Sequence, residues 1–158
     1  MKSIDAVITW VDGSDIEYKK KIDKHLTSST NYKKQYLQAN EIEYCVKSIL
    51  KFAPFVRKIF IVTDSQKPSF SGLEDLIVSN KVKVVDHKEI FKGYEKYLPT
   101  FNIRSIDAVL HRIEGLSEMF VYFNDDVFLI NKIYEEDWFV KDKVVLMGNW
   151  AKSYSVNP

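Results

Sequence analysis

The chain has 158 residues, of which 46% are hydrophobic and 14% are aromatic. This length and composition predict one globular domain, residues 1–158, with a sizeable core, and they exclude a disordered chain. With 23 basic and 22 acidic residues the formal net charge is +1, which gives no general case for a nucleic-acid partner. We find no apolar stretch suited to a signal peptide or an integral membrane segment, so a cytoplasmic location is expected.

The only cysteine, Cys45, can form no disulfide within the chain, which fits a reducing compartment. It lies within a helical apolar pattern, so we expect it in the core rather than as a nucleophile.

Hydrophobic periodicity and turn signals divide the chain into strands that alternate with helices. The first half predicts a strand at 4–11, a lysine-rich helix at 16–26, an exposed loop at 27–31, an ambiguous segment at 32–37, a helix at 42–50 and a strand at 58–63. The second half predicts a short helix at 73–77, a strand at 81–86, an irregular segment at 94–101, a helix at 103–113, a strand at 120–124, a short helix at 134–139, a last strand at 144–147 and a frayed or truncated end at 150–158. This alternation predicts an α/β fold with a mostly parallel sheet flanked by helices.

Each of four predicted strands runs into a loop that contains an acid. These loops begin at Asp12, Asp64, Asp86 and the run Asn124-Asp125-Asp126. Parallel strands bring their carboxyl ends to one edge, where ligands of open α/β sheets bind. Two adjacent carboxylates there form a hard-oxygen site suited to Mg²⁺ or Mn²⁺. The alternative for this run is a solvated turn, because Asn and Asp both favour turns.

Other signals at this edge are weaker. The loop after the first strand suits a nucleotide or phosphate at a helix N-terminus, and it equally suits a turn with a helix cap. His87, directly after the third acidic end, is expected as a surface or turn residue, with a catalytic or ligand role as the less favoured alternative. The chain contains neither a G-x-G-x-x-G nor a Walker A sequence, which argues against hydride transfer and P-loop ATP hydrolysis.

Several ordered motifs spread over residues 4–129 resemble the Stealth family of sugar-phosphate transferases, which includes capsular polysaccharide phosphotransferases. They are 4–15 (IDAVITWVDGSD), 47–49 (KSI), 53–59 (APFVRKI), 62–68 (VTDSQKP), 98–102 (LPTFN), 111–118 (HRIEGLSE) and 122–126 (YFNDD). Agreement of several motifs in order is far more specific than any one alone, and it favours the metal interpretation of Asp125 and Asp126 over the turn.

The resemblance implies a Rossmann-like nucleotide-sugar-binding domain similar to type-A glycosyltransferases. It implies a nucleoside diphosphate sugar donor, with a UDP-sugar favoured, and a saccharide acceptor in capsular or exopolysaccharide synthesis. An acceptor hydroxyl would attack the phosphorus that bears the donor sugar, forming a phosphodiester and releasing a nucleoside monophosphate. Such phosphoryl transfer depends mainly on positioning and charge neutralisation.

The resemblance also assigns roles to residues. Asp125 and Asp126 would hold the metal ion and, with Arg112 and His111, form the catalytic set. Arg112 would meet phosphate charge, although it equally suits a helix-end arginine that donates to carbonyls; His111 is a weaker candidate, for the base. The substrate-binding residues would be Thr9, Trp10, Val11, Asp12, Gly13, Asp64, Gln66, Asn102 and Asn124.

Three departures from the family pattern keep other functions open. Leu37-Gln38 stands where the family carries Arg-Asp, and Ile103-Arg104 stands where it carries Ser-His. Family members also continue into further conserved blocks, so this chain is expected to be the N-terminal part of a longer transferase. The alternatives are a nucleotide-sugar-binding module without catalysis and a conventional type-A glycosyltransferase. The lysines at 19–21 have two interpretations: a peripheral contact with the inner face of the membrane, or a solvated helix face. The oligomeric state is not predicted.

Overall fold

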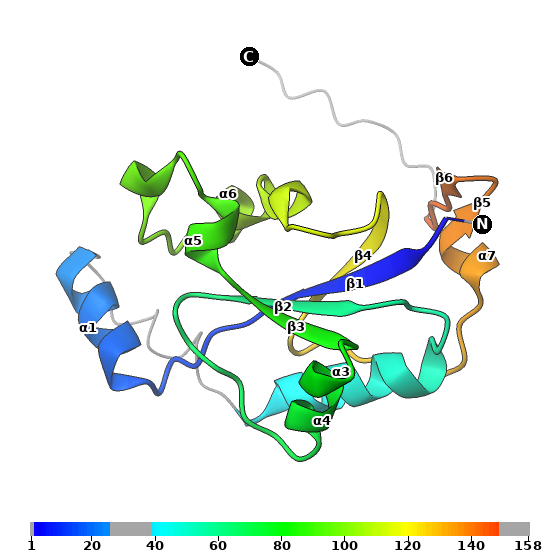
Figure 1. The fold of residues 1–158 in the computed structure, drawn as a ribbon, viewed down its shortest axis with the longest axis horizontal. Coiled ribbons are helices and arrows are strands. Elements are labelled where there is room, and N and C mark those ends of the chain that lie inside the picture. Colours follow the sequence, from blue (N-terminus) through cyan, green and yellow to red (C-terminus); the bar gives the residue numbers. More distant parts are fainter. Residues whose placement is uncertain (1, 26–38, 149–158) are drawn as a thin grey trace.

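A computed structural model describes residues 2–25 and 39–148. Its centre is a four-stranded sheet in the order β3-β2-β1-β4, in which every neighbouring pair is parallel (Figure 1). The strands are β1 (Ile4–Thr9), β2 (Ile59–Thr63), β3 (Val82–Asp86) and β4 (Met119–Asn124). Helices cover both faces, which confirms the predicted α/β class with a parallel sheet.

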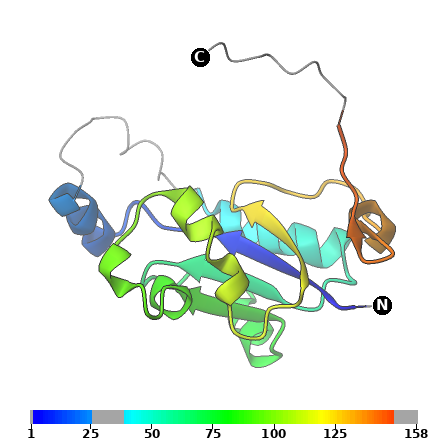
Figure 2. The same ribbon diagram turned by 90° about the horizontal axis from the view of Figure 1, so that it is seen from above.

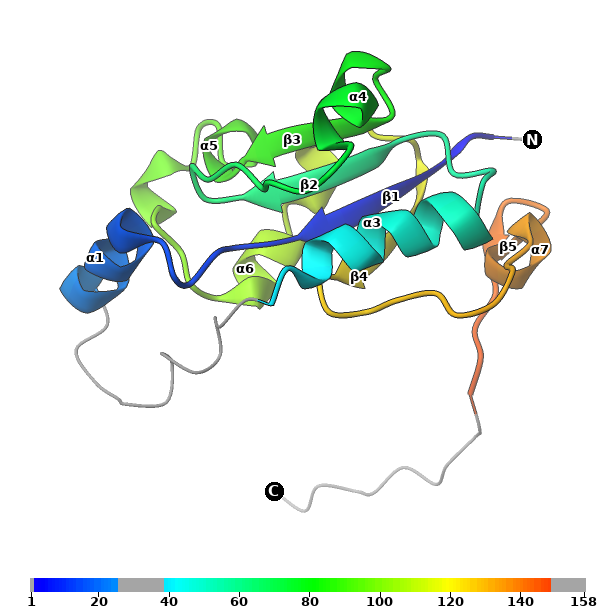
Figure 3. The same cartoon turned by 90° about the horizontal axis from the view of Figure 1, so that it is seen from below.

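The two faces of the sheet form two separate hydrophobic cores because successive side chains of a strand point to opposite faces. Ala6 and Ile8 of β1 pack in the cluster that contains the buried face of α3 (Glu41–Phe52) and Leu73 of α4 (Leu73–Val78). Val7 packs in the other cluster. The elements over that face are α5 (His87–Ile90), α6 (Ile103–Asp107) and the 3₁₀ turn η2 (Leu110–Arg112). Figure 3 shows α3 along the first face, and Figure 2 shows the segment of α6 and η2 over the second.

Strand register brings the carboxyl ends together at one edge. Thr9 lies opposite Asn124 on one side and Val62 on the other, and Thr63 lies opposite Asp86. Helix α1 (Ile16–His25) follows β1 beyond this edge (Figure 1). The edge therefore carries the loops that the sequence analysis singled out.

The predicted helix at 103–113 is two pieces. Helix α6 ends at Asp107, and η2 follows after Val109, whose backbone (φ −116°, ψ 2°) has left the helical region. The amides of Val109 and Arg112 bond to carbonyls three residues earlier, as in a tight 3₁₀ turn. Ile106 and Leu110, one in each piece, both pack in the core under the sheet.

The predicted strand at 144–147 is also wrong in most of its length. Only Lys143–Val144 (β6) is paired, in an antiparallel ribbon with β5 (Phe139–Val140), and Leu146 and Met147 are largely exposed. The short helix expected before it is α7 (Glu135–Trp138). The predictions for 27–31, 32–37 and 150–158 lie outside the described residues. Within the described residues no helix combines the length and apolar character needed to cross a bilayer.

Candidate active site at the carboxyl edge of the sheet

A hollow of about 180 Å³ opens at the carboxyl edge, and it joins residues far apart in the chain. Five predicted site residues line it: Thr9, Trp10, Val11, Asn124 and Asp125. The wall also contains Tyr18, Val62, His87, Thr100, Phe101, Ile103 and Ile106. The ends of β1 and β4, predicted to meet, do meet here.

Hydrogen bonds orient Asn124 from within the sheet. The Tyr122 hydroxyl donates to Asn124 Oδ1 at 2.9 Å and lies 2.8 Å from Thr9 Oγ1. Because a hydroxyl has one proton, Thr9 is then the donor to Tyr122. Burial raises the pKa of Tyr122, with the Thr9 hydrogen bond opposing and the charges of Asp107 and Asp125 adding, so the phenol stays protonated at neutral pH. The oxygen of Asn124 is thus engaged, which leaves its NH₂ group as a donor.

The segment after β4 is a turn fastened to α3. The Val127 amide donates to Asn124 O at 3.2 Å, and the Leu129 amide donates to Ser48 Oγ at 3.0 Å. The apolar run at 127–130 forms no strand. The turn alternative therefore describes the local backbone, and the same turn places Asp125 in the wall of the hollow.

Cys45 packs directly beneath this turn. Its Sγ donates to Asn124 O at 3.7 Å, and its side chain is buried. Burial, followed by the negative charges of Asp125 and Asp126, raises the pKa of the thiol to about 12. Cys45 is a core residue, as predicted, and both carboxylates lie close enough to act on it.

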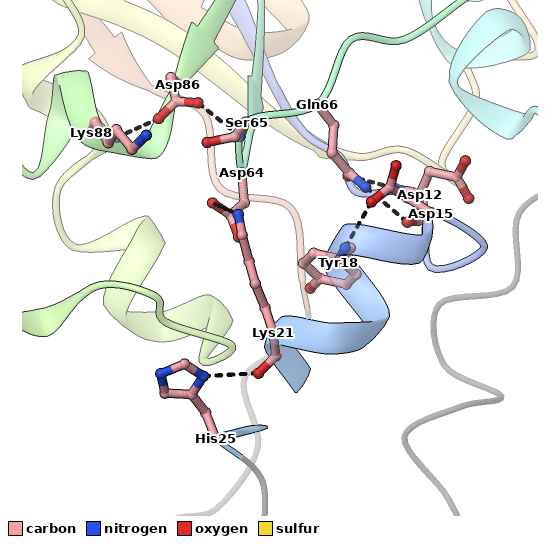
Figure 4. Close-up of polar contacts among 10 residues, drawn as sticks. All are labelled: Asp12, Asp15, Tyr18, Lys21, His25, Asp64, Ser65, Gln66, Asp86 and Lys88. Atoms are coloured by element: carbon pink, nitrogen blue, oxygen red, sulfur yellow. Dashed lines mark hydrogen bonds and ion pairs between the residues drawn. The ribbon is translucent and has the colours of Figure 1, made fainter. Parts of the chain in front are cut away.

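A second group of predicted residues ties the loops of the edge together (Figure 4). The Asp12 amide donates to Gln66 Oε1 at 2.8 Å, and Gln66 Nε2 donates back to Asp12 O at 2.9 Å. The Asp12 carboxylate accepts from the amide and hydroxyl of Ser14, and Asp15 caps α1 through the Tyr18 amide. Asp12, Gly13 and Gln66 do not line the hollow, and they hold the β1–α1 and β2–α4 loops in fixed relation.

The ends of β2 and β3 carry buried polar atoms with no hydrogen-bond partner among the described residues. They are Thr63 Oγ1, Asp64 Oδ2 and His87 Nδ1. The other oxygen of Asp64 accepts from Lys21 Nζ at 3.0 Å (Figure 4). Buried polar groups in native structures are nearly always paired, so each such atom calls for an explanation.

His87 is 3% exposed, and the expectation of a surface or turn residue is wrong. Burial lowers the pKa of His87; Asp64 and Asp86 oppose this, and the charge of Lys21 adds to it. The imidazole is therefore neutral at pH 7. The local signal was Asp86, whose carboxylate caps α5 through the Lys88 amide and thereby fixes where the histidine lies.

The remaining predicted residues lie away from the wall of the hollow. Arg112 donates to Ile90 O and Lys92 O and stacks on Tyr94, which is the helix-end arrangement weighed as its alternative. Asn102 caps α6 by accepting from the Arg104 amide. His111 is exposed and does not line the hollow. A catalytic role for Arg112 or His111 stays a prediction.

The carboxylates of Asp125 and Asp126 suit a metal ion only if other ligands complete its coordination. The described part of the chain contains no group of three or more His, Cys, Asp and Glu side chains placed to hold an ion. Asp125 is half-buried and Asp126 is exposed. Mg²⁺ is commonly held by one or two carboxylates together with water and substrate phosphates. The pair therefore fits an ion that binds along with a diphosphate rather than one held in a closed protein cage.

Comparison with known protein families identifies the family of this chain. The family model described as Stealth protein CR2, conserved region 2, matches residues 35–147, and Stealth protein CR1, conserved region 1, matches residues 2–29. This chain belongs to the Stealth family. The two regions together contain every residue of the hollow.

Two curated relatives are named as polysaccharide phosphotransferases. A capsular polysaccharide phosphotransferase, cps12A of Actinobacillus pleuropneumoniae, is 42% identical over 163 residues, covering 97% of this chain. A receptor polysaccharide phosphotransferase, WefC of Streptococcus gordonii, is 38% identical over 148 residues, covering 90% of this chain. The aligned parts are 42% and 43% of those two proteins, so this Stealth chain spans less than half the length of these relatives.

Proposed function

We propose that this Stealth chain carries the donor site of an enzyme that transfers a sugar 1-phosphate from a nucleoside diphosphate sugar to a sugar hydroxyl in capsular or exopolysaccharide synthesis. The observation that carries the proposal is the single hollow in which Asp125 and Asn124, at the end of β4, face the Thr9–Val11 wall at the end of β1. The relatives named above, which are capsular and receptor polysaccharide phosphotransferases, support it.

The nucleotide, UDP being the favoured one, lies along the β1 side of the hollow. Trp10, Tyr18 and Phe101 supply an apolar and aromatic lining there, as small-molecule sites commonly have. The buried, unpaired Nδ1 of His87, which lies in the wall of the hollow, offers an imidazole nitrogen to the base. A small rotation of the His87 side chain is needed, because this nitrogen is buried.

The diphosphate lies toward β4. The NH₂ of Asn124, left free as a donor by the Tyr122 hydroxyl, hydrogen-bonds a phosphate oxygen. Asp125 and Asp126 hold Mg²⁺ or Mn²⁺ beside it. When bound, the ion neutralises phosphate charge and stabilises the charge that develops in transfer. The chain's own contribution is to hold the two carboxylates on the turn fastened to α3 and so keep the ion site in line with the nucleotide wall.

The nucleotide released identifies the reaction. The chain is incubated with UDP-sugars, Mn²⁺ and saccharide acceptors, and UMP and UDP are separated by chromatography. Release of UMP with formation of a phosphodiester is expected. Release of UDP would replace the proposal with conventional glycosyl transfer. Metal-dependent UDP binding without release of either nucleotide would make the chain a binding module, a result that its span of less than half the relatives' length makes worth testing.

A further inference from the structure

A second hollow, larger than the first, lies between α1 and the parts of the chain that carry Asp64, Lys88 and Leu98–Pro99. Its volume is about 420 Å³, within the range of roughly 300–1,000 Å³ typical of small-molecule sites. Its basic wall consists of Lys20, Lys21, Lys24 and Lys88, and Leu98 and Pro99 form an apolar side. We call it the lysine groove.

The lysine groove has uncompensated positive charge. Its two acids are both paired: Glu17 with Lys20 at 2.7 Å and Asp64 with Lys21 at 3.0 Å. Lys24 and Lys88 form no ion pair with any residue that the structure describes. Figure 4 shows Lys21 extending from α1 to Asp64, with Lys88 on α5 beside Asp86. Two ammonium groups thus remain to attract an anion from solution.

The groove lies near the donor hollow, because α1 contributes residues to the walls of both. Tyr18 of α1 and Phe101 line the donor hollow and meet edge to face, with ring centroids 5.9 Å apart. Lys21, three positions after Tyr18 on α1, and Pro99, two positions before Phe101, line the groove instead, and no described residue lines both hollows. A ligand in the groove therefore leaves the donor hollow free.

The charge and the exposure of α1 favour a soluble anion over a lipid surface. A helix that lies on a membrane needs an exposed apolar face beside its basic one. The apolar residues Tyr18 and Ile22 are buried at 4% and 2% exposure, and only Ile16 is largely exposed. Nothing on α1 can therefore enter the acyl region as a continuous stripe.

We propose that the lysine groove binds an internal phosphodiester of the acceptor glycan, which earlier transfer has placed close to the accepting end. This rests on the proposed function: each sugar-phosphate transfer leaves one phosphodiester, so after the first round the acceptor is itself an anion. Lysine ammonium groups bind phosphate oxygens as point charges and do not read the sugar. The groove thus selects acceptors that already carry the product linkage.

The test compares two probes on the full 158-residue chain by calorimetry. One is three hexoses joined by phosphodiester bonds, and the other is the same hexoses joined by glycosidic bonds. The native chain is expected to bind the phosphodiester probe about tenfold more tightly, with the difference shrinking as salt rises. In the variant Lys24→Gln with Lys88→Gln this preference disappears. The matched control Lys132→Gln with Lys143→Gln, which removes two exposed lysines elsewhere, keeps it.

Equal binding of the two probes by the native chain overturns the proposal, as does an unchanged preference in the Lys24/Lys88 variant. A third arm uses vesicles that contain phosphatidylglycerol. If the variant loses vesicle binding and keeps the phosphodiester preference, the groove is a lipid-headgroup site and the proposal fails. UDP binding, measured in parallel, is expected to be the same in all variants. Its absence in the native chain would count against the proposed donor site and not against the groove.

Discussion

The two edges of the sheet differ in whether their buried polar groups are hydrogen-bonded. At the amino edge, Asp5 is 0% exposed and fully satisfied. It accepts from Arg57 Nε at 2.9 Å, from Arg57 Nη2 at 2.5 Å and from the Ser117 amide at 2.7 Å. These contacts join β1 to the segments that enter β2 and β4. At the carboxyl edge, Thr63, Asp64 and His87 each keep a buried atom without a partner among the described residues.

This difference indicates a division of labour within one sheet. A buried charge is tolerated where it is paired and hydrogen-bonded, and such a site stabilises the fold. Polar groups left unsatisfied destabilise the fold, and they recur at sites that bind ligands. The amino edge therefore stabilises the domain, and the unpaired atoms at the carboxyl edge are consistent with the substrate site proposed there.

The largest effect is expected at the amino edge. Arg57→Ala leaves the Asp5 carboxylate buried with only the Ser117 amide, and we expect a loss of about 2–3 kcal/mol in the free energy of unfolding. The figure is smaller than the roughly 3–5 kcal/mol expected for a fully buried pair, because the guanidinium is itself half exposed. Urea unfolding measures it. The exposed pair of Lys2 and Glu118 is the control, and Lys2→Ala is expected to change nothing measurable. Equal stabilities of the two variants would contradict the division of labour.

The next effect is expected at the end of β4. Asp125→Ala and Asp126→Ala are each expected to weaken metal-dependent UDP binding by at least about tenfold, because charge on the ion site is lost. Unfolding stability should stay close to native, since neither carboxylate is fully buried. Calorimetry with and without Mn²⁺ measures this, with the exposed Asp75→Ala as the control. Native affinity in both variants would refute the site.

Tyr122→Phe tests whether the sheet orients Asn124. Removing the hydroxyl deletes its bonds to Asn124 and Thr9, and we expect about fivefold weaker UDP binding, in line with one hydrogen bond of about 1 kcal/mol. Asn124→Ala should then weaken UDP binding less in the Tyr122→Phe variant than it does in the native chain. Tyr97→Phe, at an exposed tyrosine, is the control. Independent, additive losses would show that Tyr122 does not act through Asn124.

The smallest effect concerns pH. Because burial lowers the pKa of His87 in the folded chain, the unfolded chain binds a proton more readily as pH falls below about 6.5. Stability is therefore lost on acidification, by at most about 1 kcal/mol between pH 6.5 and pH 5.5 for this one group. In His87→Gln that part of the slope should vanish. A parallel pH profile for the two proteins would show that His87 is protonated equally in both states.

The sequence alone predicted the parallel sheet and the meeting of its carboxyl ends. Strands covered on both faces need uninterrupted apolar runs, and such runs at β1, β2 and β4 stop where the polar residues Asp12, Asp64 and Asn124 follow. It also placed Asp125 at the end of β4 and Cys45 in the core. These features depend on residues close together within one helix or strand, and the hydrophobic periodicity of the sequence reflects such residues.

Tertiary structure decided the rest. The pairing of Asp12 with Gln66 joins loops 54 positions apart, and the burial of His87 depends on how α5 packs against the sheet at the end of β3. The break after Asp107 and the engagement of Arg112 with two carbonyls follow from how one segment fits under the sheet. Local hydrophobic periodicity predicts the alternation of strands and helices, since each of these elements is stabilised by residues a few positions apart. Which polar atoms find partners depends on contacts between distant segments, and only the folded chain sets those.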